Sequence, residues 1–182
     1  MSHVIQTYTG RSFDILDPNP DDIDIADIAR ALSMQARFSG HMTNFYSVAE
    51  HSFRTSKIVP KEHALAALLH DASEAYIGDM ASPLKRYTAM GSMYMNIEDK
   101  LMRAIADRFN FTWPLSDEVK KADLAMLCTE RRDLLKEAHD PELWSAWASD
   151  DNAIPARILP FSWRGAEMLF LLRYAVLKRG GR

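Results

Sequence analysis

Residues 67–79 read Ala-Leu-Leu-His-Asp-Ala-Ser-Glu-Ala-Tyr-Ile-Gly-Asp, which places His70 and Asp71 side by side in an apolar run. The residues just before them, 64–69, are all alanine or leucine, and this pattern predicts a buried helix. Burying an unpaired carboxylate costs several kcal/mol unless a cation or hydrogen-bond donors compensate it. A metal ion bound by both side chains would supply that compensation, and such a site favours metal-assisted catalysis.

The helix around this pair is expected to run from about Glu62 to Tyr76. On a period of 3.6 residues, Ala67, His70, Asp71 and Glu74 would share one face. The helix would then present an imidazole and two carboxylates along a single edge. The alternative is that Glu74 is solvated near the helix end and that His70 is a core histidine with satisfied hydrogen bonds.

A second polar residue in an apolar stripe is Asp123. It lies among Val119, Ala122 and Met126, which form the inward face of a later helix, so it should be ion-paired or metal-bound. The alternative is a buried salt bridge to an arginine or lysine. A single histidine such as His51 is more often structural than a metal ligand. It becomes a candidate ligand because His70, Asp71 and Asp123 would need further ligands to complete a metal site. Two imidazoles and two carboxylates suit Zn²⁺, Mn²⁺ or Co²⁺.

The rest of the chain also shows helical periodicity, and strand-like alternation is nearly absent, so the predicted fold class is all-α. We expect one domain over residues 1–182, with an N-terminal arm at 1–20 that includes an extended or strand segment at 11–16. A loop-rich segment at 139–161 should precede the last helix. Further helices are expected from near Asp21, at Ser47–Ile58, at Ser92–Phe109, from Ser116 as N-cap to about Ala138, and at Ser162–Lys178.

Composition narrows the functional classes. Of 182 residues 47% are hydrophobic, which indicates a folded globular protein, and the net charge of −3 argues against a nucleic-acid binder. The N-terminus has no apolar signal-peptide core, and the apolar run Met168–Leu177 is short and interrupted by Arg173. We therefore expect a cytoplasmic protein that does not enter a membrane. The basic pair Arg131-Arg132, with Glu130 and Asp133 beside it, is expected to form a solvated helix face.

The ordered set His51, His70-Asp71 and Asp123 resembles the H…HD…D pattern of the HD-domain metal-dependent phosphohydrolases. The likeness is closest to bacterial HD-type 5′-deoxynucleotidases and to related phage dATP triphosphohydrolases, and it covers roughly residues 11–135. It implies a compact HD-domain bundle of about six to eight helices. The motifs that carry it are Arg37-Phe38, Tyr46–Ser52, His70–Glu74, Gly78-Asp79 and Pro83-Leu84-Lys85.

The resemblance also implies roles for single residues. One divalent ion (zinc, manganese or cobalt, with magnesium possible) would be bound by His51, His70, Asp71 and Asp123. Glu74 and Asp79 would be the catalytic carboxylates, and Arg37, Phe38 and Lys85 would lie at the nucleotide. Phe38 stands where the deoxynucleotidases tend to carry tryptophan, which leaves base or sugar selectivity open. Gly40-His41 is typical of a phage-like branch, and His41 is a candidate phosphate contact, with loop structure or an interface as the alternatives.

The activity that follows from the resemblance is hydrolysis of a phosphate ester in a small nucleotide. The first choice is a 5′-deoxynucleotidase that converts a dNMP to a deoxynucleoside and phosphate. The alternative is a dNTP triphosphohydrolase that releases triphosphate or single phosphates, and a non-catalytic nucleotide sensor is a weaker one. A homo-oligomer, dimer or hexamer, is expected through the segment containing Trp144 and Trp147 or through the last helix.

Overall fold

The computed structural model describes residues 3–140, 142–145 and 150–180. Regular structure in these residues is almost entirely helical, which confirms the all-α prediction. Two short antiparallel strands, β1 (Val4–Gln6) and β2 (Ser12–Asp14), pair at the N-terminus, where an arm was expected. The helices are α1 (Ile25–Met34), α2 (Val48–Ile58), α3 (Ala64–Leu68), α4 (Glu74–Ile77), α5 (Ser82–Tyr87), α6 (Ala89–Phe109), α7 (Asp117–Leu134), α8 (Glu142–Ser145) and α9 (Trp163–Arg179).

Side-chain caps determine where several of these helices begin. Ser47 accepts a hydrogen bond from the Glu50 amide at the start of α2, as the sequence predicts. The first helix begins later than expected, because Asp24 is its cap and residues 20–22 form a separate 3₁₀ turn. Ser116 occupies the predicted cap position of α7, but its side chain makes no capping hydrogen bond.

The predicted continuous helix from Glu62 to Tyr76 is wrong in the middle. It ends as α3 at Leu68, resumes as α4 at Glu74, and residues 69–73 form turns between the two. His70 and Asp71 therefore lie in a tight turn and not on the face of a helix. The sequence of this segment contains no glycine or proline before Gly78, so it carries no local signal for the break.

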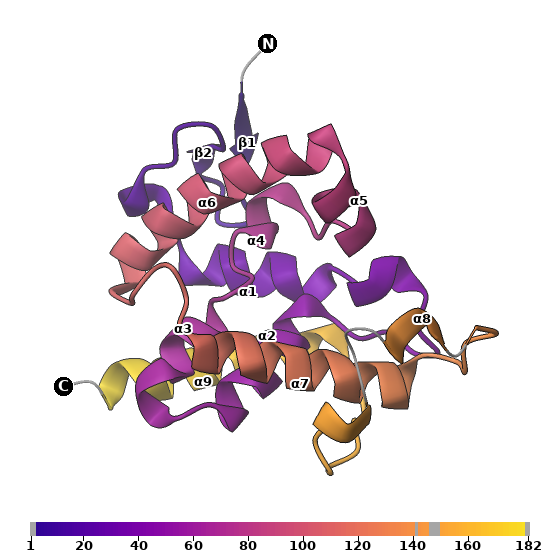
Figure 1. Cartoon of the computed structure of the whole chain (residues 1–182). Helices are drawn as coiled ribbons and strands as arrows, with labels where there is room; N and C mark the ends of the chain where they lie inside the picture. Colours follow the sequence, from indigo (N-terminus) through magenta and orange to yellow (C-terminus); the bar gives the residue numbers. More distant parts are fainter. Residues whose placement is uncertain (1–2, 141, 146–149, 181–182) are drawn as a thin grey trace.

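The core lies where α1, α2, α3 and α9 pack together. In Figure 1, α1 crosses the middle of the molecule, α6 passes above it, and α7 lies along α2 below. Fully buried members of this core are Phe13, Ile28, Leu32, Leu68, Leu101, Ile105 and Phe170. No helix in the described part of the chain is long and apolar enough to cross a membrane.

The segment 139–161, predicted to be rich in loops, also contains short helical elements. Residues 139–161 contain the short helix α8 and a 3₁₀ turn at Asp150–Asn152. Trp144, expected in a core or interface, is half-buried against Phe38, with ring centroids 6.5 Å apart. Trp147 lies outside the described residues. The helix α5 lies in a stretch, between Tyr76 and Ser92, for which the sequence predicts no helix.

The contact between α5 and α6 depends on a glycine. A Cβ atom added at Gly91 would lie 2.1 Å from the Lys85 carbonyl oxygen and 2.4 Å from that of Leu84. Both are backbone atoms, which cannot rotate away as a side chain can. Only glycine therefore lets α6 begin this close to α5, and Lys85 is positioned by that approach.

We predict that Gly91→Ala lowers the free energy of unfolding by roughly 1–3 kcal/mol, because overpacking displaces α5. Gly165→Ala is the matched control, since its Cβ would meet the Ser162 Oγ at an ordinary 3.4 Å. That change should be neutral or stabilising by up to about 1 kcal/mol through helix propensity. Urea denaturation of both variants measures the difference, and equal stabilities would contradict the assigned role of Gly91.

Candidate functional site

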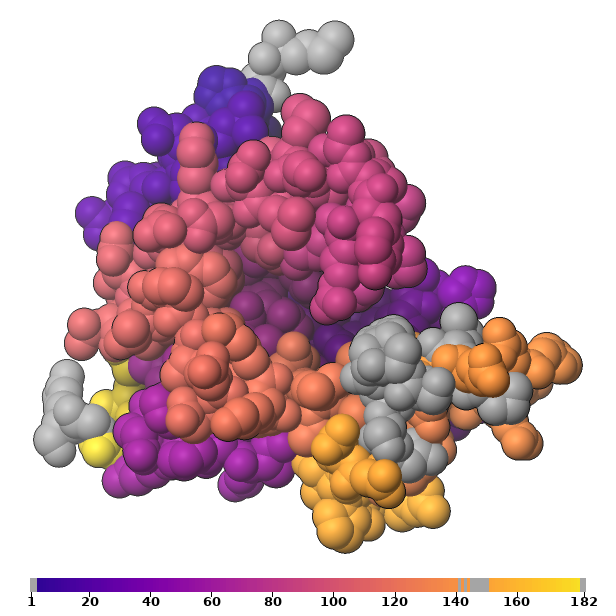
Figure 2. Space-filling model, viewed as in Figure 1, coloured from indigo at the N-terminus to yellow at the C-terminus, as the bar shows by residue number. Residues whose placement is uncertain are grey.

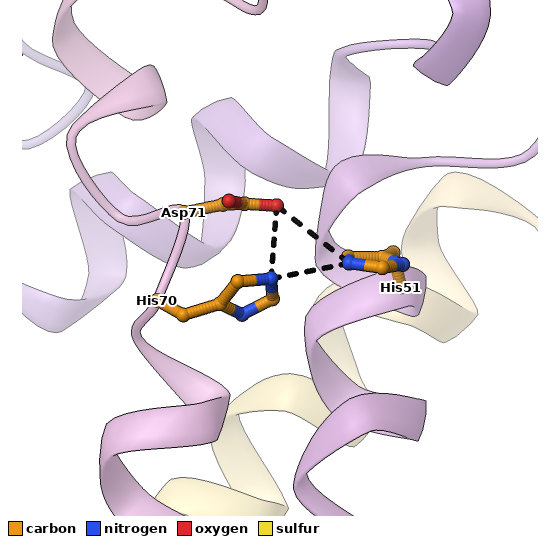
Figure 3. A group of neighbouring side chains, drawn as sticks. All are labelled: His51, His70 and Asp71. Atoms are coloured by element: carbon orange, nitrogen blue, oxygen red, sulfur yellow. Dashed lines mark hydrogen bonds and ion pairs between the residues drawn. The ribbon is translucent and has the colours of Figure 1, made fainter. Parts of the chain in front are cut away.

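Three of the predicted ligand residues converge on one point. His51 comes from α2, while His70 and Asp71 come from the turn between α3 and α4, and their side chains point toward one another (Figure 3). The two imidazole Nε2 atoms are 3.1 Å apart, and the Asp71 Oδ2 atom is 3.3 Å from His70 Nε2. One potential ligand atom from each of the three residues lies within 4.8 Å of the other two. The break in the helix is what lets His70 and Asp71 face His51 together.

The hydrogen bonds on the far side of each ring fix which nitrogen faces the centre. His51 Nδ1 donates to the Glu130 Oε1 atom at 2.6 Å, and His70 Nδ1 donates to the Ala67 carbonyl at 2.8 Å. In the neutral rings, each Nε2 then presents a lone pair to the centre. Two lone pairs at 3.1 Å beside carboxylate oxygens repel each other unless a proton or a metal ion lies between them. The donor set therefore fits a divalent ion.

Asp123 joins this cluster from α7. Its Oδ1 atom is 3.0 Å from His51 Nε2 and 3.7 Å from His70 Nε2. Its side chain is 46% exposed, so it lies at the solvent edge of the cluster, whereas the His51 ring is fully buried. The structure thus brings together all four residues predicted as ligands, from three separate segments of the chain.

Sequence reasoning missed the carboxylate behind His51. Glu130 is fully buried and binds His51 with one oxygen and the Arg37 Nε atom, at 3.0 Å, with the other. Such carboxylate–histidine pairs orient the ring and raise its basicity at metal sites. The expected solvated face at Arg131-Arg132 is wrong, since the Arg132 side chain is only 20% exposed and binds Asp133 and the Ile154 carbonyl. The side chains of Glu130 and Asp133 beside the pair are buried. Glu130 lies seven residues after Asp123, on the same face of α7, and this spacing is the signal that could have identified it.

The ionisation of the cluster reflects its mutual contacts. Burial and the Arg37 charge lower the pKa of His51, but Glu130 and Asp123 outweigh them and raise it to about 9. Burial likewise lowers the pKa of His70, while Asp71 and Asp123 raise it above the ordinary value. Burial raises the pKa of Asp123, yet its hydrogen bonds with the two histidines hold that pKa well below its usual range. Without a metal the centre therefore holds protons, which a metal ion would have to displace.

The predicted catalytic carboxylates lie beside this cluster, one buried and one more exposed. Glu74 is 7% exposed, and its Oε2 atom is buried without a hydrogen-bond partner. Burial, together with the negative charges of Asp71 and Asp79, raises the pKa of Glu74 well above its usual value. Desolvation and the charge of Asp71 also raise the pKa of Asp79, against the opposing effect of Arg37.

The residues predicted at the substrate differ in how closely they approach the cluster. The Arg37 Nη1 atom is 3.5 Å from the Asp71 Oδ2 atom, so Arg37 reaches the centre directly. Lys85 is held by Glu98 at 2.7 Å on the neighbouring helix. Phe38 has a left-handed backbone with φ of 50°, and its ring lies 5.6 Å from the Arg37 guanidinium carbon. His41 is exposed, and its amide donates to the Phe38 carbonyl.

The surface is hollowed above the earlier helices. Figure 2 shows a hollow between the pink surface of α5 and α6 and the orange surface of α7, with violet and magenta atoms at its floor. The side chains of Asp71 and Asp123 are 21% and 46% exposed, so the cluster borders solvent. A small ligand can therefore reach the carboxylates without opening the core.

Comparison with known proteins assigns the family. Residues 31–113 match the model of the family described as 5′-deoxynucleotidase YfbR-like. The uncharacterized protein YfdR of Escherichia coli strain K12 is 46% identical over 130 residues, which span 71% of each chain. The chain belongs to the YfbR-like family. An uncharacterized protein of Rhodobacter capsulatus is 41% identical over 123 residues, covering 63% of this chain and 62% of that protein.

The residues that match the YfbR-like family model include only part of the side-chain cluster. The matched residues include Arg37, His51, the His70-Asp71 pair and Glu74. The matched residues end before α7, so the family model does not include Asp123 or Glu130. Asp123 is predicted from the sequence pattern and lies in the cluster, whereas Glu130 is identified only from its position in the structure.

We predict that Glu130→Gln weakens zinc or manganese affinity by about 10–100-fold, because His51 loses the carboxylate that orients its ring. Calorimetric titration of the metal-free protein measures this. Glu50→Gln is the matched control: Glu50 is also fully buried, but it binds Arg54 and the Phe161 amide. That variant should lose stability and keep its metal affinity, and an unchanged affinity in Glu130→Gln would remove Glu130 from the centre.

Proposed function

We propose that this chain is a metal-dependent 5′-deoxynucleotidase that hydrolyses deoxynucleoside monophosphates to a deoxynucleoside and inorganic phosphate. The observation that carries the proposal is the convergence of His51, His70, Asp71 and Asp123 beside a buried arginine, in a chain of the YfbR-like family. A divalent ion held by these four residues would supply a Lewis acid for the phosphoryl group and lower the pKa of a water molecule.

Arg37 is suited to bind the phosphate. Burial lowers the pKa of its guanidinium, but Glu130, Asp71 and Asp123 raise it further above its ordinary value, so the group stays charged. Glu130 accepts a hydrogen bond from the Arg37 Nε atom, and the Arg37 Nη1 atom is directed toward Asp71. A charged, oriented donor of this kind stabilises negative charge on the non-bridging oxygens as the transition state forms.

Glu74 is suited to move a proton. In the reaction, a water oxygen forms a new bond to phosphorus, the bond from phosphorus to the 5′ oxygen breaks, and that oxygen must gain a proton. Burial and the charges of Asp71 and Asp79 raise the pKa of its carboxyl group well above the usual value, which favours the protonated form that can donate a proton. Its Oε2 atom is buried and has no hydrogen-bond partner among the described residues. Asp79, at the far end of the same turn, contributes a second carboxylate beside the substrate.

We predict that the purified chain releases inorganic phosphate from dAMP in the presence of Mn²⁺, Co²⁺ or Zn²⁺ and loses this activity in a chelator. The same assay with dATP separates the candidate activities, since a triphosphohydrolase releases triphosphate. Release of triphosphate alone would replace the proposed activity with that alternative. Bound metal without turnover of any nucleotide would instead favour a sensor.

We predict that Glu74→Gln lowers kcat for dAMP by about 10²–10⁴-fold, the usual contribution of general acid–base catalysis, with metal affinity unchanged. Asp123→Ala is the paired variant, which should lose metal affinity first and activity in consequence. Metal titration and steady-state kinetics on both variants make the distinction. An unchanged kcat in Glu74→Gln would exclude Glu74 from proton transfer.

A further inference from the structure

Three side-chain hydrogen bonds converge on the main chain of residues 74–79, here called the acidic turn because it begins with Glu74 and ends with Asp79. The Gln35 Nε2 atom donates to the Glu74 carbonyl at 2.9 Å, and the Asp79 amide donates to the Gln35 Oε1 atom at 3.1 Å. The Tyr94 hydroxyl donates to the Gly78 carbonyl. The acidic turn is thus held by two residues that belong to neither of its flanking segments.

Gln35 binds both ends of the acidic turn with a single side-chain amide. It is the C-cap of α1, and its own carbonyl accepts a hydrogen bond from the Val48 amide at 3.1 Å. Arg37, two residues later, is fixed in the same way by its amide hydrogen bond to the Tyr46 carbonyl. Gln35 therefore ties the acidic turn to the segment that carries the phosphate-binding arginine.

Tyr94 holds the acidic turn from α6. Its acceptor belongs to Gly78, whose φ of 79° lets the chain reverse, and the Gly78 amide also donates to the Glu74 carbonyl at 2.8 Å. The Lys85 ammonium lies 5.4 Å from the centre of the Tyr94 ring. The contact links α5 and α6, the upper border of the hollow in Figure 2, to the acidic turn.

The acidic turn needs such support because of its charges. The carboxyl groups of Glu74 and Asp79 lie close enough to Asp71 for its charge to raise both of their pKa values. Like charges in proximity favour opening of this segment, whose helical part, α4, is only four residues long. Gln35 and Tyr94 bind main-chain atoms, so neither of them occupies the carboxyl group of Glu74 or Asp79.

We propose that Gln35 and Tyr94 form a clamp that positions the carboxyl groups of Glu74 and Asp79 for the reaction, Gln35 being the principal positioning residue. The proposal rests on the proposed hydrolysis of dNMPs. Misplacing a reacting group by about 1 Å, through a change away from the chemistry, can cost up to 10²-fold in rate. Loss of the clamp should therefore appear in kcat, while the metal ligands, which it does not touch, keep their affinity.

The test is steady-state hydrolysis of dAMP with Mn²⁺ by Gln35→Ala and Tyr94→Phe. We expect kcat to fall by about 10–100-fold in Gln35→Ala and by a smaller factor in Tyr94→Phe, with KM and Mn²⁺ affinity within about threefold of the wild-type values. Tyr94→Phe removes one oxygen atom, so it remains informative if Gln35→Ala folds poorly. Wild-type kcat in both variants would overturn the clamp alone, and no turnover by the wild-type chain would overturn the proposed function with it.

A conservative variant separates positioning from simple stability. Gln35→Glu keeps the acceptor for the Asp79 amide, but it can donate to the Glu74 carbonyl only when its carboxyl is protonated. Its kcat relative to wild type should therefore be higher at pH 6 than at pH 8, and an equal ratio at both pH values would contradict the clamp.

Ser33→Ala is the matched control for the loss of a hydrogen bond at this end of α1. Ser33 is buried, and its hydroxyl donates to the Arg30 carbonyl, away from the acidic turn. It should lower the melting temperature and leave kcat unchanged. A loss of kcat in Ser33→Ala equal to that in Gln35→Ala would show that only helix stability matters.

Discussion

The approach of the His51 and His70 rings, Nε2 to Nε2 at 3.1 Å, is the constraint that the rest of the site depends on. Each ring is held from behind by a hydrogen bond at Nδ1, one to Glu130 and one to the Ala67 carbonyl. Neither ring can turn away without leaving a buried polar group unpaired. In the neutral rings the two Nε2 lone pairs therefore face each other, and the nearby oxygens of Asp71 and Asp123 add negative charge. A metal ion relieves all of these repulsions at once, and without it protons on the rings do so.

Buried charged side chains connect the two histidines to Arg37. Glu130 binds both His51 and Arg37, so one carboxylate orients the ring of a proposed metal ligand and the guanidinium that is proposed to bind phosphate. Removing one partner from such a buried network leaves an uncompensated charge, which costs several kcal/mol. Gln35 likewise binds two groups with one side chain, since it is hydrogen-bonded to the main chain of both Glu74 and Asp79. The side chains that support the site are thus hydrogen-bonded to the backbone or to each other.

Much of this arrangement follows from sequence, and what does not has identifiable causes. Apolar periodicity and the caps predict most of the long helices, and the polar interruptions at His51, His70-Asp71 and Asp123 predict the four residues that converge. The turn at 69–73 could not be foreseen, because tertiary contacts of His70 and Asp71 override a sequence with good local helix propensity. Glu130 was hidden by its charged neighbours, and only its spacing from Asp123 distinguishes it. Gln35 and the acidic turn are about forty residues apart in sequence, so no local sequence pattern predicts the hydrogen bonds between them.

X-ray absorption spectroscopy of the chain loaded with one equivalent of zinc shows whether His51 and His70 bind one ion together. If they do, its first coordination shell includes two imidazole nitrogens at about 2.0–2.1 Å, with the remaining positions filled by oxygen. The multiple-scattering pattern of imidazole identifies those nitrogens. A shell made of oxygen alone, or failure of the chain to retain zinc, would show that the two histidines are not metal ligands.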